Sequence, residues 1–150
     1  MLDRIQSSTL KQLFIYWEHQ RHHRPAPSRA DIHPGDMVEF LPNVYLIEGE
    51  GEPRRFRVRF MGPTLINWCG RDFVGRYVDQ ITNQALAALH ELVTTREPWL
   101  VSGQYKNING RMILYELLAL PLLPDEATVD MILGGIAEVP SSEIVQATTL

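Results

Sequence analysis

Few residues of this sequence are of a type and spacing that could do chemistry. Cys69 is the single thiol, so neither a disulfide within the chain nor a zinc site built on cysteine pairs can form. His19 and His23 stand four residues apart, but no third metal ligand follows at a defined spacing. His90-Glu91 does not continue into a HExxH motif, and no nucleophile elbow or glycine-rich phosphate loop occurs. We therefore expect no metal and no catalytic centre.

Length and composition are typical of one globular domain. The chain has 150 residues, of which 45% are hydrophobic and 21% charged. Its longest apolar run, 117–123, contains a proline and is too short to span a bilayer, and Asp3 and Arg4 interrupt any secretory signal. The first 30 residues are basic, but the pI of about 5.7 and the lack of another basic stripe argue against nucleic-acid binding. We expect a cytoplasmic protein.

The first element is an amphipathic helix. Leu10, Leu13, Phe14 and Trp17 recur at i, i+3, i+4 and i+7 and form one apolar stripe. Pro25 ends the helix, because proline lacks a backbone donor and clashes with the preceding turn. The chain is then expected to divide into an N-terminal helical extension, a main domain and a C-terminal tail, at 1–27, 28–140 and 141–150.

Five later segments are predicted as strands, with two helices between the second and third. In 56–61, Phe56, Val58 and Phe60 alternate with arginines, which predicts one apolar face. The last two strands are apolar on both faces, so their sheet must be covered on both sides. This predicts an α+β fold: a five-stranded antiparallel sheet with helices on one face and the N-terminal helix over the other. The predicted strands are 43–48, 56–61, 99–106, 111–120 and 128–139.

Local motifs add a family resemblance. Tyr16-Trp17-Glu18, followed by the run RPAPSRADIHP at 24–34, resembles the signature YW…GRP.PSRADIDP of a bacterial subgroup of single PAS domains. LPNVYLI at 41–47 and FRVRFMG at 56–62 are similar to the subgroup's LPNLFLID and FRYRLAGT, and shorter matches extend the likeness across about 16–135. The chain departs from the AGT element, because Thr64 is displaced by one position. The resemblance implies the PAS fold and a sensory or regulatory module, not an enzyme, and specifies no ligand.

Flavin and haem, two cofactors known from PAS domains, would each depend on a single residue of this chain. The flavin-binding cysteine of light-sensing PAS domains lies in a motif resembling GRNCRFLQ, whereas Cys69 precedes its glycine. Haem-binding PAS domains take an axial histidine from the helix that would contain His90, but a lone histidine on an apolar face is more often a packed residue. We expect no cofactor.

The resemblance leaves room for a small apolar ligand between sheet and helices. Concave sites are mostly apolar with a few polar anchors, although aromatic side chains there can equally fill the core. We interpret the chain as a stand-alone sensory module that binds an unidentified regulatory protein. The alternative is a small cone-shaped α+β enzyme, which would need a polar dyad such as His90 with an acid. Candidate cavity residues are Phe60, Trp68, Phe73, Tyr77, His90 and Tyr115.

The N-terminal helix also predicts a homodimer. Ile5, Ile15 and Tyr16 lie off its main stripe, so the helix carries more apolar surface than one contact uses. Two-fold dimers are the commonest oligomers. The competing interpretation is a monomer in which Ile15 and Tyr16 pack on the chain's own loops. The candidate interface residues are Leu10, Leu13, Phe14 and Trp17.

Overall fold

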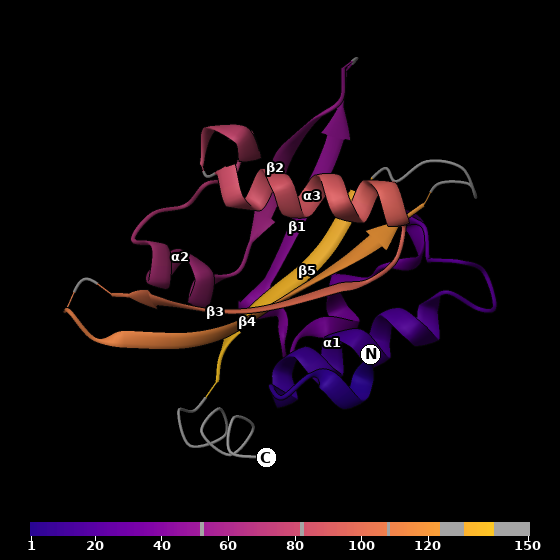
Figure 1. Ribbon diagram of the computed structural model, residues 1–150. Helices are drawn as coiled ribbons and strands as arrows, with labels where there is room; N and C mark the ends of the chain where they lie inside the picture. Colours follow the sequence, from indigo (N-terminus) through magenta and orange to yellow (C-terminus); the bar gives the residue numbers. More distant parts are fainter. Residues whose placement is uncertain (52, 82, 108, 124–130, 140–150) are drawn as a thin grey trace.

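The sheet has five antiparallel strands in the order β2-β1-β5-β4-β3 (Figure 1). The computed structural model describes residues 1–51, 53–81, 83–107, 109–123 and 131–139. This is the predicted fold class, and the predicted strands are confirmed apart from 128–130, which lie outside the described residues. Within these ranges no helix is long and apolar enough to cross a membrane. The strands are β1 Val44–Glu50, β2 Arg55–Met61, β3 Trp99–Lys106, β4 Met112–Leu122 and β5 Met131–Glu138.

Helices cover both faces of the sheet, as both apolar strand faces require (Figure 1). α2 (Pro63–Cys69) and α3 (Asn83–Thr95) lie on one face, called here the cavity face. α2 begins at a proline and ends at Gly70. Gly70 has a φ of 78°, a left-handed conformation that glycine adopts without steric strain. α1 (Ser8–Gln20) lies on the opposite face, called here the α1 face.

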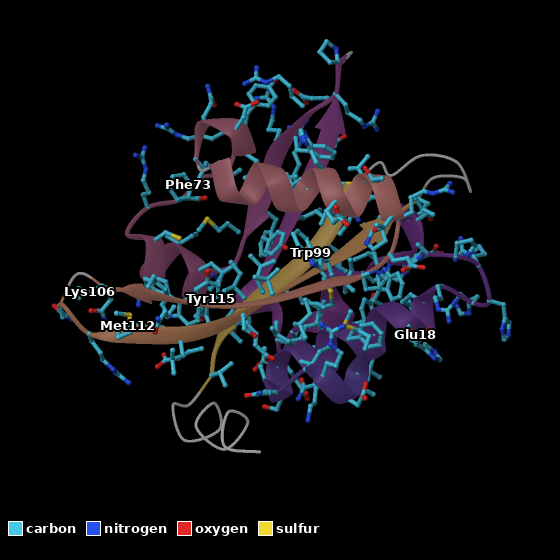
Figure 2. All side chains as sticks on the ribbon, in the orientation of Figure 1. Glu18, Phe73, Trp99, Lys106, Met112 and Tyr115 are labelled. Atoms are coloured by element: carbon cyan, nitrogen blue, oxygen red, sulfur yellow. The ribbon has the colours of Figure 1, made fainter. Side chains whose placement is uncertain are left out.

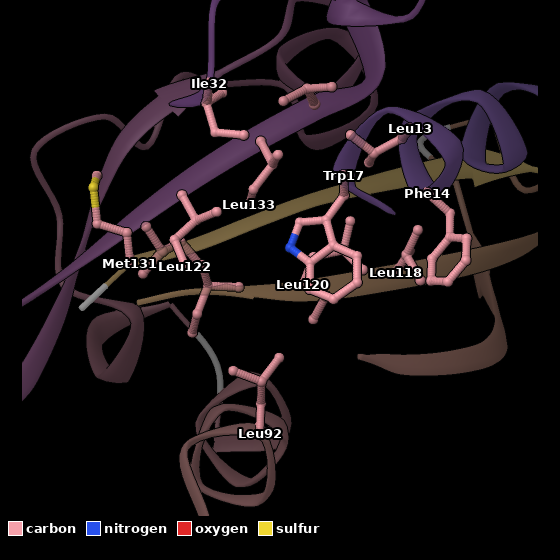
Figure 3. Close-up of a cluster of buried hydrophobic side chains, with 14 of the residues drawn as sticks. Leu13, Phe14, Trp17, Ile32, Leu92, Leu118, Leu120, Leu122, Met131 and Leu133 are labelled. Carbon is pink, nitrogen blue, oxygen red and sulfur yellow. The ribbon is translucent and has the colours of Figure 1, made fainter. Parts of the chain in front are cut away.

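α1 is anchored to the sheet by its predicted stripe. Ser7 caps the helix by accepting the Leu10 N–H at 3.2 Å. Figure 3 shows Phe14 and Trp17 packed against Leu118 and Leu120 of β4. The Trp17 Nε1–H donates to the carbonyl of Pro121 at 2.9 Å, so the indole is both buried and hydrogen-bonded. The helix therefore covers the part of the α1 face built by β4 and β5.

A β-bulge corrects the predicted alternation of β2. The register between β1 and β2 shifts between Leu46 and Ile47, so that Leu46 pairs with Phe60 and Ile47 with Val58. Arg59 is the extra residue. Leu46 also pairs with Leu133, which belongs to the same buried cluster as Trp17 (Figure 3). Phe60 therefore belongs to the α1 face, whereas Val58 stays on the cavity face.

Candidate ligand cavity

The cavity face holds a cavity of about 280 Å³ between the sheet and the helical side. Strands β1, β2, β4 and β5 form its floor, and α2, the segment after it and α3 form its roof. Its size lies just below the usual range of small-molecule sites, and its described lining is almost wholly apolar. The described lining residues are Tyr45, Ile47, Val58, Met61, Leu65, Cys69, Phe73, Val78, Ile81, Leu89, Leu117, Ala119 and Ile136.

The hydroxyl of Tyr45, on the cavity floor, already has a hydrogen-bond partner within the sheet. Tyr45 of β1 reaches across β5 and donates its hydroxyl to the carbonyl of Leu118 at 3.0 Å. The ring needs Gly134 beneath it, since a Cβ there would lie 2.1 Å from the ring carbon that bears the hydroxyl. Burial raises the pKa of Tyr45, so the hydroxyl remains a protonated donor. Tyr45 thus presents its apolar ring, and not a free polar group, to an occupant.

The cavity opens to solvent beside the end of α2. Cys69 lines the cavity and is also exposed, and Phe73 is half-buried in the same lining. The guanidinium carbon of Arg71 lies 5.4 Å from the centre of the Phe73 ring, within the range of a cation–π contact. Partial burial raises the pKa of the Cys69 thiol, which argues against a nucleophilic thiolate.

Of the six predicted cavity residues, Phe73 is in this lining. Figure 2 shows it on the connection between α2 and α3, and shows Tyr115 on the hairpin of β3 and β4. Trp68 and Tyr115 form a row with Tyr105, with ring centres 6.5 and 5.8 Å apart along the row, beside the cavity and not in its described lining. Phe60 lies on the α1 face. The expectation that these three line the cavity is therefore corrected.

Tyr77 lies in an ion-pair cluster at the outer edge of β2. Its ring stacks under Arg55 and Arg57, at 3.7 and 4.4 Å from the two guanidinium carbons. Its hydroxyl donates to Glu50, which Arg57 also binds at 2.9 Å. Arg55 binds both carboxylate oxygens of Asp79, at 2.8 and 2.9 Å. Tyr77 is thus held by charged partners and is not among the described residues that line the cavity. The expectation that it lines the cavity is therefore corrected.

His90 lies on the surface of α3 and is exposed. It borders a second pocket with Phe56, Val93 and Thr94, and it is not among the described residues that line the cavity. The expectation that His90 lines the cavity is therefore corrected. At this position His90 could not serve as the axial ligand of a haem in the cavity. Among the described residues, no group of three histidine, cysteine or acidic side chains is placed to hold a metal ion.

A flavin is a poor fit to the described lining. Its ring carries carbonyl and N–H groups that need hydrogen-bond partners when they are buried. The side chains of the described lining offer the Tyr45 hydroxyl, which already donates to the Leu118 carbonyl, and the weakly donating thiol of Cys69. These groups cannot satisfy the polar edge of such a ring.

Sequence reasoning missed most of the lining, and the reason is geometric. The sequence around Tyr45 predicts a strand and gives no sign of a cavity, although the adjacent Gly134-Gly135 pair indicates a close approach on both faces of β5. Arg59 is the extra residue between Val58 and Phe60. Because of this bulge, Val58 and Met61, three positions apart, both lie on the cavity face. No local pattern in the sequence marks that bulge.

The α1 face carries a buried carboxylate that holds the start of α1. Glu116 of β4 is 2% exposed. It accepts the Ser7 N–H at 2.7 Å and the Gln6 N–H at 3.0 and 3.1 Å. A negative group at a helix N-terminus is favoured by the helix dipole. Glu116 and the Pro121 carbonyl therefore attach α1 to one strand at two points.

The predicted dimer residues are buried within the chain itself. Leu10, Leu13, Phe14 and Trp17 are 1%, 1%, 7% and 3% exposed, because they pack on the chain's own sheet. Tyr16 packs on the chain's own loop, where its hydroxyl accepts the His33 N–H at 2.9 Å. With α1 docked in this way, these four residues are not available to a second copy.

Comparisons with known proteins agree with this architecture. A family model described as PAS domain matches residues 5–137, a span that includes α1. No curated protein sequence matches the chain.

Several solved structures similar to the chain are light-oxygen-voltage domains. One, studied with a flavin analogue, has a TM-score of 0.57 at 13% identity and covers 77% of this chain and 90% of its own. The dark structure of the blue-light photoreceptor Aureochrome1 gives 0.57 at 9% identity, covering 79% and 91%. The LOV protein of Rhodobacter sphaeroides gives 0.52 at 15% identity, covering 71% and 64%. At these identities the likeness concerns the fold, and the family-model match assigns the chain to the PAS domain family.

Proposed function

We propose that this PAS domain is a sensory module that takes up a small apolar molecule in its cavity and signals by binding a partner protein. The observation that carries the proposal is the apolar lining of the 280 Å³ cavity, which opens at Cys69. Apolar cavities of this kind stay dry and bind small apolar molecules. PAS domains are typically sensory and not catalytic, which agrees with this use of the cavity.

Strand β4 gives such a signal a route to the surface. Leu117 and Ala119 of β4 line the cavity. On the same strand, Glu116 and Pro121 hold α1 at its start and near its end. An occupant that displaces β4 therefore acts on both attachments of α1 and alters the surface that α1 offers to an unidentified regulatory protein.

The enzyme alternative is less well supported. It required a polar dyad inside the cavity, with His90 as the proposed base. His90 is exposed and borders a different pocket. The described lining offers an occupant apolar surface, which suits binding better than acid–base chemistry.

Benzene titration followed by NMR tests the cavity. In wild-type protein we expect saturable chemical-shift changes at Leu117 and Ile136, which line the cavity, and smaller changes in α1. Ala119→Leu should abolish the changes, because the added side chain occupies cavity volume. Ala30→Leu, at an exposed position, is the matched control and should bind as wild type does. Both variants are checked for folding by thermal unfolding.

Two outcomes would contradict the proposal. Absence of saturable shifts in wild-type protein removes ligand binding in the cavity. Saturable shifts that persist in folded Ala119→Leu place the binding site elsewhere. Shifts confined to the cavity lining, with none in α1, would leave ligand binding intact and remove the β4 route.

A further inference from the structure

The rim of the cavity carries a cation whose position bears on what the occupant is. Arg71 follows Cys69, the exposed residue of the described lining, by two positions and precedes Phe73, a half-buried lining residue, by two. Its guanidinium lies over the Phe73 ring at 5.4 Å. A positive group is therefore held beside the mouth of a cavity whose interior is apolar.

Arg71 differs from the arginines of the sheet in its partners. Arg55, Arg57 and Arg59 each bind a carboxylate at 2.6 to 2.9 Å. Among the residues that the structure describes, Arg71 contacts no carboxylate, and its one recorded contact is with Phe73. Its neighbour Asp72 accepts the Val74 N–H at 2.9 Å, within its own loop. The guanidinium thus keeps its hydrogen-bond donors for another group.

We propose that the occupant is a small monocarboxylic acid, with its apolar body in the cavity and its carboxylate at Arg71. The interior cannot hold the carboxylate, because a buried charge needs a partner and the described lining supplies none. Arginine binds carboxylates through a planar fork of donors, which suits a head group that emerges at the mouth. This inference rests on the proposed function and specifies the ligand of the same cavity.

The cavity volume limits the size of the acid. At about 30 Å³ for each water-sized group, 280 Å³ holds roughly nine such groups, which corresponds to a chain of about eight carbons or one substituted aromatic ring. The long acyl chains of membrane lipids exceed this volume. Octanoate and 1-octanol are therefore suitable probes that differ in the head group alone.

Calorimetric titration of the full chain with both probes tests the head group. We expect octanoate to bind more tightly than 1-octanol, and Arg71→Gln to weaken octanoate about three- to five-fold, as for an exposed ion pair, without changing 1-octanol. Added salt should weaken octanoate alone. Arg76→Gln is the matched control, because Arg76 is an exposed arginine of the same loop. Its backbone carbonyl accepts the Val58 N–H, so this part of the loop is held at β2. Arg71→Glu should reverse the preference, toward octylammonium.

Each result bears on one of the two proposals. Equal affinities for octanoate and 1-octanol, unchanged in Arg71→Gln, overturn the carboxylic acid while the apolar cavity stands. An equal loss in Arg71→Gln and Arg76→Gln also overturns it, since general electrostatic attraction would then explain the effect. If neither probe binds, the acid is rejected, and the benzene titration shows whether the proposed function falls with it.

Discussion

Glu116 is a carboxylate in a nearly water-free position, and backbone N–H groups of Gln6 and Ser7 satisfy it. Glu116→Gln keeps the shape but exchanges one acceptor oxygen for a donor that faces those N–H groups. We expect the free energy of unfolding to fall by about 2 kcal/mol, measured by urea denaturation. Glu138→Gln is the control, because Glu138 is exposed and its contact with Arg111 is 3.4 Å long. A loss of similar size in both variants would show that Glu116 does not fasten α1.

Asp31, in the RPAPSRADIHP segment at 24–34, makes the stability of the fold depend on pH in the acidic range. The backbone N–H of Ser28 and then the guanidinium of Arg24 lower the pKa of Asp31 from 3.8 to about 2. Because the folded-state pKa is the lower one, this contribution is fully present above about pH 4 and is lost as the pH falls toward 2. We expect the difference in unfolding free energy between wild type and Asp31→Asn to shrink over that window. Asp36→Asn, at an exposed loop position, is the control.

A different result for Asp31 would be informative. A stability difference between wild type and Asp31→Asn that stays constant from pH 6 to pH 2 would mean that the carboxylate is not preferentially stabilised in the folded state. The hydrogen bonds of Arg24 also join the RPAPSRADIHP segment to the end of α1. Arg24 donates to Asp31 at 2.6 Å and to the carbonyls of Gln20 and Arg21 at the end of α1.

At the scale of elements, the helices and strands could be predicted and their register could not. Apolar periodicity identified α1, and alternation with turn residues identified the strands. The bulge at Arg59 depends on how β1 and β2 pair, which local sequence does not encode. One inserted residue sends Phe60 to the α1 face. This is the physical reason that the fold class was predicted well and the cavity lining poorly.

The approach of α1 to β5 can be tested at one glycine. A Cβ on Gly135 would lie 2.8 Å from the Leu10 Cδ2 and 3.0 Å from the Leu13 Cδ2, so Gly135→Ala requires these side chains to shift and loosens the packing of α1 on β5. We expect a loss of about 1–3 kcal/mol in unfolding free energy and faster hydrogen exchange in α1. Gly35→Ala is the matched control, because a Cβ there meets nothing within 4 Å. Unchanged exchange in α1 for Gly135→Ala would mean that the helix is not tightly docked.

At the scale of the whole molecule, the sheet divides two tasks between its faces. The cavity face leaves space that the described side chains do not fill, and the α1 face is closed by a helix with two polar attachments. The closure was predicted from the sequence, because strands that are apolar on both faces need a cover on each side. The space could not be predicted, because it depends on which side chains meet across the sheet. β4 contributes to both faces, and the proposed route between them rests on that arrangement.

Homodimer formation remains a prediction, and the docked helix changes its interface. The stripe from Leu10 to Trp17 is used within the chain, whereas Ile15 of α1 is 53% exposed. An exposed isoleucine on a helix gains from burial against a second copy. By light scattering at micromolar concentration we expect a mass of twice 17.2 kDa, and the monomer mass for Ile15→Glu, since a charge would be buried without a partner. Lys11→Glu, an exposed position one turn earlier, controls for the change in charge. A monomer in wild-type protein rejects the dimer. A dimer that persists in Ile15→Glu rejects this surface. The remaining explanation would be a dimer in which the two copies exchange α1. Because Leu10 and its neighbours would then have to leave their own sheet, such a dimer should dissociate as slowly as the chain unfolds.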